Sequence, residues 1–245
     1  MKRTTTLFAL AAMAAATVGA AADTTTVTFD NGTEGWLGPQ GIGGSTFIDP
    51  NDGVGGGPGL RTQFNNFGIT FRNNSNPAFI GNFAQYEQVT IGIDVKVHQI
   101  GTFLPVSRPF LVELRDFDSA QGGYPWTSVY YLFDWISQDT HSEYTHFEVT
   151  ITDPSSTVLP AGWGGFGDED PNTYEPRLPP GVTFADVLAG VDEIAFTTLL
   201  PGYFFTFDDY DLTLDNISIT TVVPAPGAAG VLAMGLIPVC RRRRR

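Results

Sequence analysis

Two tryptophans in glycine-rich segments are the residues of this chain best suited to binding chemistry. Trp126 follows Gly122-Gly123-Tyr124-Pro125, and Trp163 is surrounded by four glycines within residues 162–167. Such glycine and proline density indicates loops, where an exposed indole ring can meet a ligand. An aromatic face packs on the C–H bonds of a pyranose ring, while planar polar groups beside it hydrogen-bond the hydroxyls. Trp126, Trp163 and Tyr124, with Arg115 as polar partner, are therefore the candidate glycan-binding residues.

Core packing is the competing interpretation for every tryptophan, since large aromatic residues are mostly buried. Trp36 and Trp135 lie in or beside predicted strands, so we expect both in the core. Solvated strand faces are the default for the other polar candidates, which are Arg72, Arg108, Asn65, Asn66, Asn73 and Gln121.

A group of carboxylates offers metal chemistry. Asp49, Asn51 and Asp52 are close together before Gly53, and Asp30 and Asp215 could join them from neighbouring strands. Calcium takes six to eight oxygen ligands of this kind. The strict Asp-x-Asp-x-Asp-Gly loop is missing from the sequence, so solvated acidic loops are the alternative. We expect no required cofactor, and a structural calcium ion is a hypothesis that these five residues carry.

Enzymatic signatures are weak. The sequence contains no Gly-x-Ser-x-Gly elbow and no phosphate-binding loop, and its one cysteine is Cys240. His141 and His146 lack the spacing of a zinc protease, so these two and His98 are predicted to be surface histidines. Glu113 and Glu148, outward on predicted strands, are the conceivable acids of a glycoside hydrolase. A binding module should show a groove with Trp126 or Trp163 exposed, whereas a hydrolase should show two carboxylates at its floor.

Alternating apolar residues predict the elements that must hold these side chains. Val89, Ile91, Ile93, Val95 and Val97 share one face of an extended segment. The predicted strands cover residues 24–29, 68–72, 89–97, 108–116, 127–136, 147–151, 192–199 and 211–221. One short helix is predicted over 184–190, with Thr183 as N-cap and Gly190 as its end.

This pattern indicates an all-β domain over residues 23–221, a single antiparallel β-sandwich of the jelly-roll kind. The last strand changes the parity of its apolar residues between Leu214 and Ile217, which predicts a bulge at Asp215 and Asn216. The exported part would carry no disulfide, because Cys240 lies in the tail.

Both ends of the chain have the residue patterns of signals that direct a protein to its cellular location. Lys2 and Arg3 precede the apolar residues 7–18, and Ala20 and Ala22 provide the small residues of a cleavage site, so residues 1–22 are predicted to be a signal peptide. At the other end a proline-broken joint (Val223, Pro224, Ala225, Pro226, Gly227) leads into a short apolar helix and then Arg241, Arg242, Arg243, Arg244 and Arg245. An arginine block stays on the cytoplasmic side of a membrane.

The order of joint, apolar helix and arginines over residues 222–245 resembles the PEP-CTERM sorting signal, with Pro224-Ala225-Pro226 in place of the commoner Pro-Glu-Pro. The resemblance implies an exosortase-type enzyme as partner, transient anchoring of the tail helix in the inner membrane, and delivery to the cell surface or outside. An unprocessed membrane anchor is the alternative.

The net charge of the domain excludes some classes of binding partner. Without the two end segments, six basic residues face 26 acidic ones, a net charge of about −20. Such a domain repels nucleic acid and anionic lipid surfaces, so we expect neither as partner and membrane contact only through the tail.

Three segments together resemble laminin IV-type domains and galactose-binding-like carbohydrate-binding modules. They are the segment from Thr28 to Trp36, the glycine-rich segment before Leu60, and the closing residues 214–219. The resemblance implies a jelly roll that binds glycan without catalysis. We therefore expect an exported, non-catalytic glycan-binding protein or a component of an exopolysaccharide layer. A secreted polysaccharide-active enzyme is the alternative.

Overall fold

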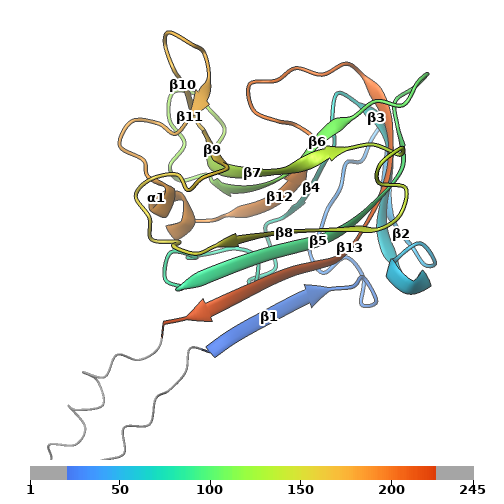
Figure 1. Ribbon diagram of the computed structural model, residues 1–245, viewed down its shortest axis with the longest axis horizontal. Coiled ribbons are helices and arrows are strands. Elements are labelled where there is room, and N and C mark those ends of the chain that lie inside the picture. Colours follow the sequence, from blue (N-terminus) through green and yellow to red (C-terminus); the bar gives the residue numbers. More distant parts are fainter. Residues whose placement is uncertain (1–20, 225–245) are drawn as a thin grey trace, which may run out of the picture. The chain divides into compact units, whose positions relative to one another are not determined.

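The computed structural model describes residues 21–224, of which Ala22–Val223 form one compact unit (Figure 1). The predicted signal peptide up to Ala20, and the sorting signal from Ala225 onward, lie outside the described residues. Val223 ends the last strand, and Pro224 follows it at the surface. Within residues 21–224, no helix combines the length and the apolar character needed to cross a membrane.

Six strands form the first sheet, which we call sheet A. They are β1 (Ala21–Val27), β2 (Gly44–Asp49), β3 (Gly59–Asn66), β5 (Gln88–Ile100), β8 (Thr145–Ile151) and β13 (Asp208–Val223). Their order is β2-β3-β13-β5-β8, with β1 paired to β13 as well. Thr24 and Thr220 share a hydrogen bond of 2.8 Å, which places β1 beside the C-terminal half of β13.

Five strands form sheet B, in the order β4-β12-β6-β7-β9. They are β4 (Thr70–Asn73), β6 (Arg108–Asp116), β7 (Thr127–Ile136), β9 (Trp163–Phe166) and β12 (Glu193–Thr197). A small hairpin of β10 (Asp168–Glu169) and β11 (Pro176–Arg177) and a 3-10 turn (Val54–Gly56) complete the elements, with one helix described below. Every pair with a defined register is antiparallel, which confirms the predicted β-sandwich.

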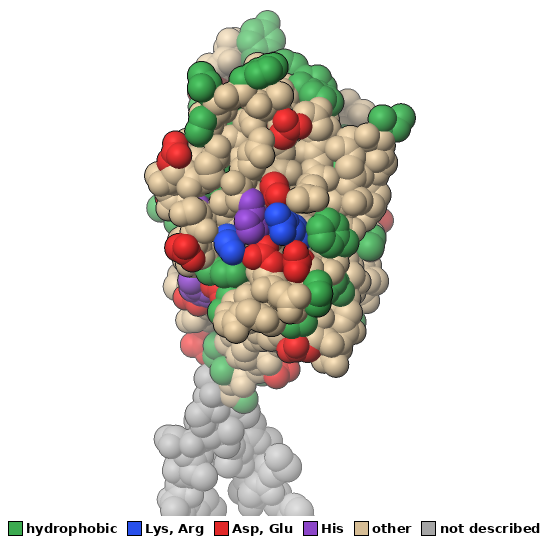
Figure 2. Space-filling model, turned by 90° about the vertical axis from the view of Figure 1, so that its right-hand side faces the viewer, with side chains coloured by type: hydrophobic (Ala, Val, Ile, Leu, Met, Phe, Trp, Pro, Cys, Tyr) green, Lys and Arg blue, Asp and Glu red, His purple; other side chains and the backbone are tan. Residues whose placement is uncertain are grey.

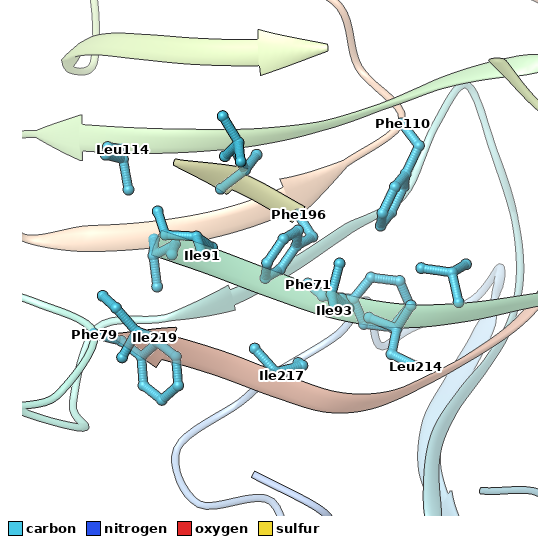
Figure 3. Packing of buried hydrophobic residues seen from close by; sticks show 14 of the residues in the cluster. Phe71, Phe79, Ile91, Ile93, Phe110, Leu114, Phe196, Leu214, Ile217 and Ile219 are labelled. Atoms are coloured by element: carbon cyan, nitrogen blue, oxygen red, sulfur yellow. The ribbon is translucent and has the colours of Figure 1, made fainter. Parts of the chain in front are cut away.

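The core lies between the two sheets (Figure 3). Sheet A contributes Ile91, Ile93, Leu214, Ile217 and Ile219, and sheet B contributes Phe71, Phe110, Leu114 and Phe196, all of them buried. The alternating side of β5 that the sequence predicts is this inner face, because Val89, Ile91, Ile93, Val95 and Val97 are all buried. Apolar burial on this scale is the main stabilising contribution to the domain.

Local signals predicted several boundaries well. β6 and β7 have the predicted bounds, and the register of β13 against β5 shifts between Asp215 and Ser218, where a bulge was expected. Helix α1 (Phe184–Ala189) begins at the predicted N-cap: the Thr183 side chain accepts from the Asp186 main chain, and the Asp186 carboxylate accepts from the Thr183 main chain.

Five strands were not predicted: β2, β3, β9 and the two-residue strands β10 and β11. β2 and β3 show little apolar alternation, because polar residues occupy inward positions beside apolar ones; Thr46 and Thr62, for example, lie on the same face as Leu60 and share a 2.6 Å hydrogen bond. β9 consists of Trp163, two glycines and Phe166, a composition typical of a loop. It is a strand because it pairs with β7 from Ser128 to Tyr131.

Two connections between the sheets run side by side at one end of the sandwich. Residues 67–69 join β3 to β4, and residues 198–207 join β12 to β13. The Thr198 main chain donates to the Ile69 carbonyl at 3.0 Å, and Asn66 lies opposite Asp208 in the strand register. The second connection rises above sheet B opposite the β10–β11 hairpin (orange, Figure 1).

Candidate functional site

A cleft of about 790 Å³ lies on the outer face of sheet B. Its floor is formed by Thr70 and Arg72 of β4, Glu193 of β12, and Glu113 and Arg115 of β6. Its walls are formed by aromatic and loop residues from three directions: Phe117, Trp126 and Phe166; Asn66, Gly68 and residues 199–203; and residues 37–40.

Strand alternation explains why charged residues form this floor. Val112 and Leu114 of β6 point into the core, so Glu113 and Arg115 between and beside them point outward. The antiparallel register places Glu193 directly opposite Arg115. Three charged side chains from two neighbouring strands therefore meet on one face of the sheet.

The floor is a buried ion network. Arg115 donates from Nη2 and Nε to Glu113 Oε2 at 2.6 and 2.9 Å, and from Nη1 to Glu193 Oε1 at 2.7 Å. These three residues are only 7, 4 and 1 % exposed. Arg72 joins through Glu193 Oε2 at 3.3 Å, and its own side chain stays half exposed in the cleft. Buried charges are stable only when paired in this way, so the network is rigid.

Trp126 is locked onto this floor. Its indole Nε1 donates to Glu113 Oε1 at 2.9 Å, and the guanidinium of Arg115 lies 4.1 Å from the ring centroid. Because Arg115 is buried beneath one face of the indole, the opposite face is the one that a ligand can reach. The structure thus places Trp126 in the lining of the cleft, with the guanidinium of Arg115 supporting the ring from below.

The facing wall is the connection between β12 and β13. Its tip turns at Leu200-Pro201-Gly202, where the Tyr203 main chain donates to the Leu200 carbonyl at 3.1 Å. Tyr203 lines the cleft, and its ring stacks on that of Phe205 with 6.3 Å between centroids. Arg108 lies over the Phe205 ring at 5.1 Å and pairs with Asp208, so a buried arginine anchors this wall to sheet B.

Tyr130 lies beside the floor on the outer face of β7. Burial, the charge of Glu113 and the neighbouring Tyr203 raise the pKa of its hydroxyl. The hydroxyl is therefore a neutral donor at neutral pH. Its ring covers Gly164 of β9, where any side chain would collide with it.

The other predicted ligand residues lie elsewhere. The sequence suggested that Trp163 lies in an exposed loop, and this prediction was wrong. Trp163 lies in β9, is 8 % exposed, and packs on Phe184 with 5.3 Å between ring centroids. Its glycine neighbours allow close packing in the sheet and do not free the ring. Tyr124 packs edge-on against Phe166 at 5.3 Å, outside the cleft lining. Burial and the carboxylates of Glu169 and Asp168 raise its pKa.

Of the two tryptophans expected in the core, one is buried and the other is exposed. Trp36 is fully buried between Phe79 and Phe196. Trp135 is 41 % exposed, so its prediction was wrong: it lies at the end of β7, on the side where Phe205 covers it at 6.1 Å. Sequence reasoning missed Glu193 and Phe117 altogether. A glutamate directly before the apolar strand residues 194–196 was the available signal for the first of these.

Two of the candidate calcium ligands, Asp49 and Asp52, pair with basic residues. Figure 2 shows basic and histidine side chains gathered among acidic ones on one face of the domain. Asp52 lies 2.8 Å from Lys96 Nζ and 2.7 Å from His98 Nε2, and Asp49 lies 3.2 Å from Arg61. Asp215 accepts from the Val54 and Asn216 main chains, and Asp30 from Thr28.

Between residues 21 and 224, no three His, Cys, Asp or Glu side chains are arranged to hold a metal ion. Asn51 contributes its main-chain N–H to Asp49 at 3.1 Å. A structural calcium ion therefore stays a prediction from the sequence, and the present geometry of Asp49 and Asp52 serves ion pairs.

Two of these carboxylates have shifted pKa values. Burial alone would raise the pKa of Asp52, but hydrogen bonds from Lys96 and Thr213 and the charge of His98 hold it below its usual range. Burial raises the pKa of Asp215, helped by the nearby carboxylates of Asp94 and Asp30.

The remaining titratable candidates do not form a site. His141 is 7 % exposed, against the expectation of a surface histidine, because it stacks near Phe147. His98 is partly buried on Asp52, and His146 is exposed beside Asp94. Glu148 is exposed on β8 of sheet A, whereas Glu113 lies on sheet B, so these two glutamates do not form a catalytic pair.

No known protein-family profile and no curated protein matches the chain significantly. Solved structures do match. The CBM22-1 xylan-binding domain of a Paenibacillus barcinonensis protein has a TM-score of 0.44 and 16 % identity, over 85 % of this chain and 100 % of that one. A family 30 carbohydrate-binding module of a Clostridium thermocellum cellulosomal cellulase has a TM-score of 0.42 and 12 % identity, over 80 and 92 %.

The CBM22-1 and GH10 modules of a Clostridium thermocellum endo-xylanase, complexed with xylohexaose, match with a TM-score of 0.46 and 12 % identity. The match covers 80 % of this chain, which spans only 28 % of that larger protein. These identities and TM-scores are too low to carry a function from those proteins to this chain.

Proposed function

We propose that the protein is a non-catalytic glycan-binding protein whose site is the cleft on sheet B. The observation that carries the proposal is Trp126, fixed by Glu113 and Arg115 so that one indole face is directed into the cleft. A ring held in place before binding loses little entropy when a sugar packs on it.

The surroundings of Trp126 supply the polar half of sugar recognition. Arg72, Asn66 and Gln40 line the same cleft and carry planar groups that can donate to hydroxyls. Tyr203 provides a second aromatic surface from the opposite wall. This combination of aromatic ring faces and a few fixed polar groups is typical of binding sites for small molecules and sugars.

A glycoside hydrolase is the second candidate, because Glu113 and Glu193 both lie on the cleft floor. Both oxygens of each carboxylate, however, already accept hydrogen bonds. Glu113 accepts from Arg115, Trp126 and Ser128, and Glu193 accepts from Arg115, Arg72 and Asn74. A catalytic acid or base needs an oxygen free to exchange a proton with the substrate. The arrangement therefore favours binding.

A glycan-array screen of the purified chain tests the proposal. We expect binding to one class of polysaccharide, and Trp126→Ala should weaken it about tenfold or more. Phe47→Ala is the matched control, since Phe47 is an exposed aromatic residue on β2 of the other sheet. Unchanged binding by Trp126→Ala in a folded protein would remove the cleft as the site. Release of reducing ends from bound glycans would favour the hydrolase.

The cellular setting follows from the ends of the sequence. A signal peptide over 1–22 and a sorting signal over 222–245 support export, processing by an exosortase-type enzyme and a place at the cell surface. A glycan-binding domain delivered there would attach to, or form part of, an exopolysaccharide layer.

A further inference from the structure

A second aromatic group lies at the rim of the cleft. The ring centroid of Phe67 is 5.5 Å from that of Phe204 and 5.1 Å from that of Phe207. These residues nevertheless remain 44, 87 and 53 % exposed. Clustered apolar groups left in water mark a contact surface more often than scattered ones do. We call these three phenylalanines the rim cluster.

The rim cluster is continuous with the cleft. Phe67 lies between Asn66 and Gly68, which both line the cleft, and Phe204 follows Tyr203, which lines it too. The two segments that carry the cluster are the neighbouring connections between the sheets.

Hydrogen bonds hold the cluster in a fixed place. The Tyr210 hydroxyl donates to the Phe67 carbonyl at 3.1 Å, and Thr206 donates to Asp208 at 2.9 Å. Arg108 donates to Thr206 at 3.1 Å, between Phe204 and Phe207. These bonds therefore anchor the chain at Phe67 and, through Thr206, between Phe204 and Phe207.

The charge of the cleft lining and of the surrounding surface indicates which kind of ligand can bind there. The two glutamates and two arginines of the cleft lining balance, and the rim cluster is uncharged, while most of the 26 acidic residues lie elsewhere on the domain. A polyanion would be repelled by the surrounding surface and would find no net positive charge in the cleft. An uncharged polymer meets neither obstacle.

We propose that an uncharged polysaccharide chain bound in the cleft continues over the rim cluster, so that the protein selects polymer over short sugars. The inference rests on the proposed function, and it adds the length and charge class of the ligand. The cleft holds one part of the chain against Trp126, and Phe204 packs on sugar units beyond it.

Titration calorimetry with neutral xylo- and cello-oligosaccharides tests this. The affinity of the purified full chain should rise from di- to tetra- to hexasaccharide. Phe204→Ala should lower the hexasaccharide affinity about fivefold and leave disaccharide binding unchanged, since only the longer chain reaches the rim. Phe47→Ala should change neither affinity, and light scattering should give the same molecular mass for all three proteins.

The outcomes separate the two proposals. Equal loss for short and long sugars, or no loss for either, overturns the rim proposal while the cleft remains the site. Dissociation of a dimer by Phe204→Ala with unchanged length dependence overturns it too, because the rim would then contact a second copy. If the unmodified protein binds none of these sugars but binds uronate-containing oligomers, the inference of an uncharged ligand is overturned. If it binds neither class and no glycan of the array, the proposed function falls and the rim proposal with it.

Discussion

At the scale of single residues, Arg115 organises the candidate site. Its guanidinium pairs with Glu113 and Glu193, and Trp126 covers it. The same side chain thus compensates two buried negative charges and supports the aromatic ring that a sugar would contact. Removing it would leave Glu113 buried without a counter-charge and Glu193 with only the half-exposed Arg72, which is far more costly than losing a pair at the surface.

Arg115→Met should therefore lower the free energy of unfolding by about 3–5 kcal/mol, measured by chemical denaturation. Arg177→Met is the matched control: Arg177 pairs with Asp168 and Asp170 while 40 % of its side chain is exposed, so we expect a loss below about 1 kcal/mol. Similar losses in the two variants would show that the cleft network is not a buried ion network.

At the scale of elements, a charge network fastens a turn to sheet A. The segment after β2 carries Asp52, which contacts Lys96 and His98 of β5 and Thr213 of β13. The Tyr144 hydroxyl donates to the Asp52 carbonyl from the segment before β8. One carboxylate thereby connects the turn to the two central strands of the sheet.

This connection makes stability depend on pH. The pKa of Asp52 is lower in the folded protein than its ordinary value of 3.8, so its contribution is present above that pH and is lost as the pH falls through the folded pKa. Asp52→Asn should lower stability at neutral pH. It should also flatten the loss of unfolding free energy upon acidification below about pH 4, measured by denaturant titration. If the variant loses unfolding free energy below pH 4 as steeply as the unmodified protein does, other carboxylates cause the acid dependence.

At the scale of the whole molecule, we expect the domain and the two end segments to have separate tasks. The domain carries the cleft, and the ends carry the predicted signals for export and sorting. The strongly acidic domain and the block of arginines from Arg241 to Arg245 are suited to opposite sides of a membrane.

Mass spectrometry of the surface form of the protein checks this division. We expect a mature N-terminus at Asp23 and a C-terminus within residues 223–227, with the arginine block removed. A C-terminal peptide that still ends in Arg245 would indicate a permanent anchor in place of sorting.

Sequence patterns determined the fold class, because an inner strand face must be apolar at every second residue wherever two sheets pack. That rule located β5, β6 and β7, and a capping residue located α1. It could not locate β2 and β3, whose polar residues pair across strands, or β9, whose glycines read as a loop.

The candidate site was predictable only in part. The sequence alone singled out Trp126 and Arg115, from a glycine-rich segment and an outward strand position. Only the tertiary structure decided that Arg115 lies beneath that indole, that Glu193 completes the floor, and that Trp163 belongs to the core. The physical reason is that sheet register joins residues about 80 positions apart in the chain, and nothing local in the sequence records which strands become neighbours.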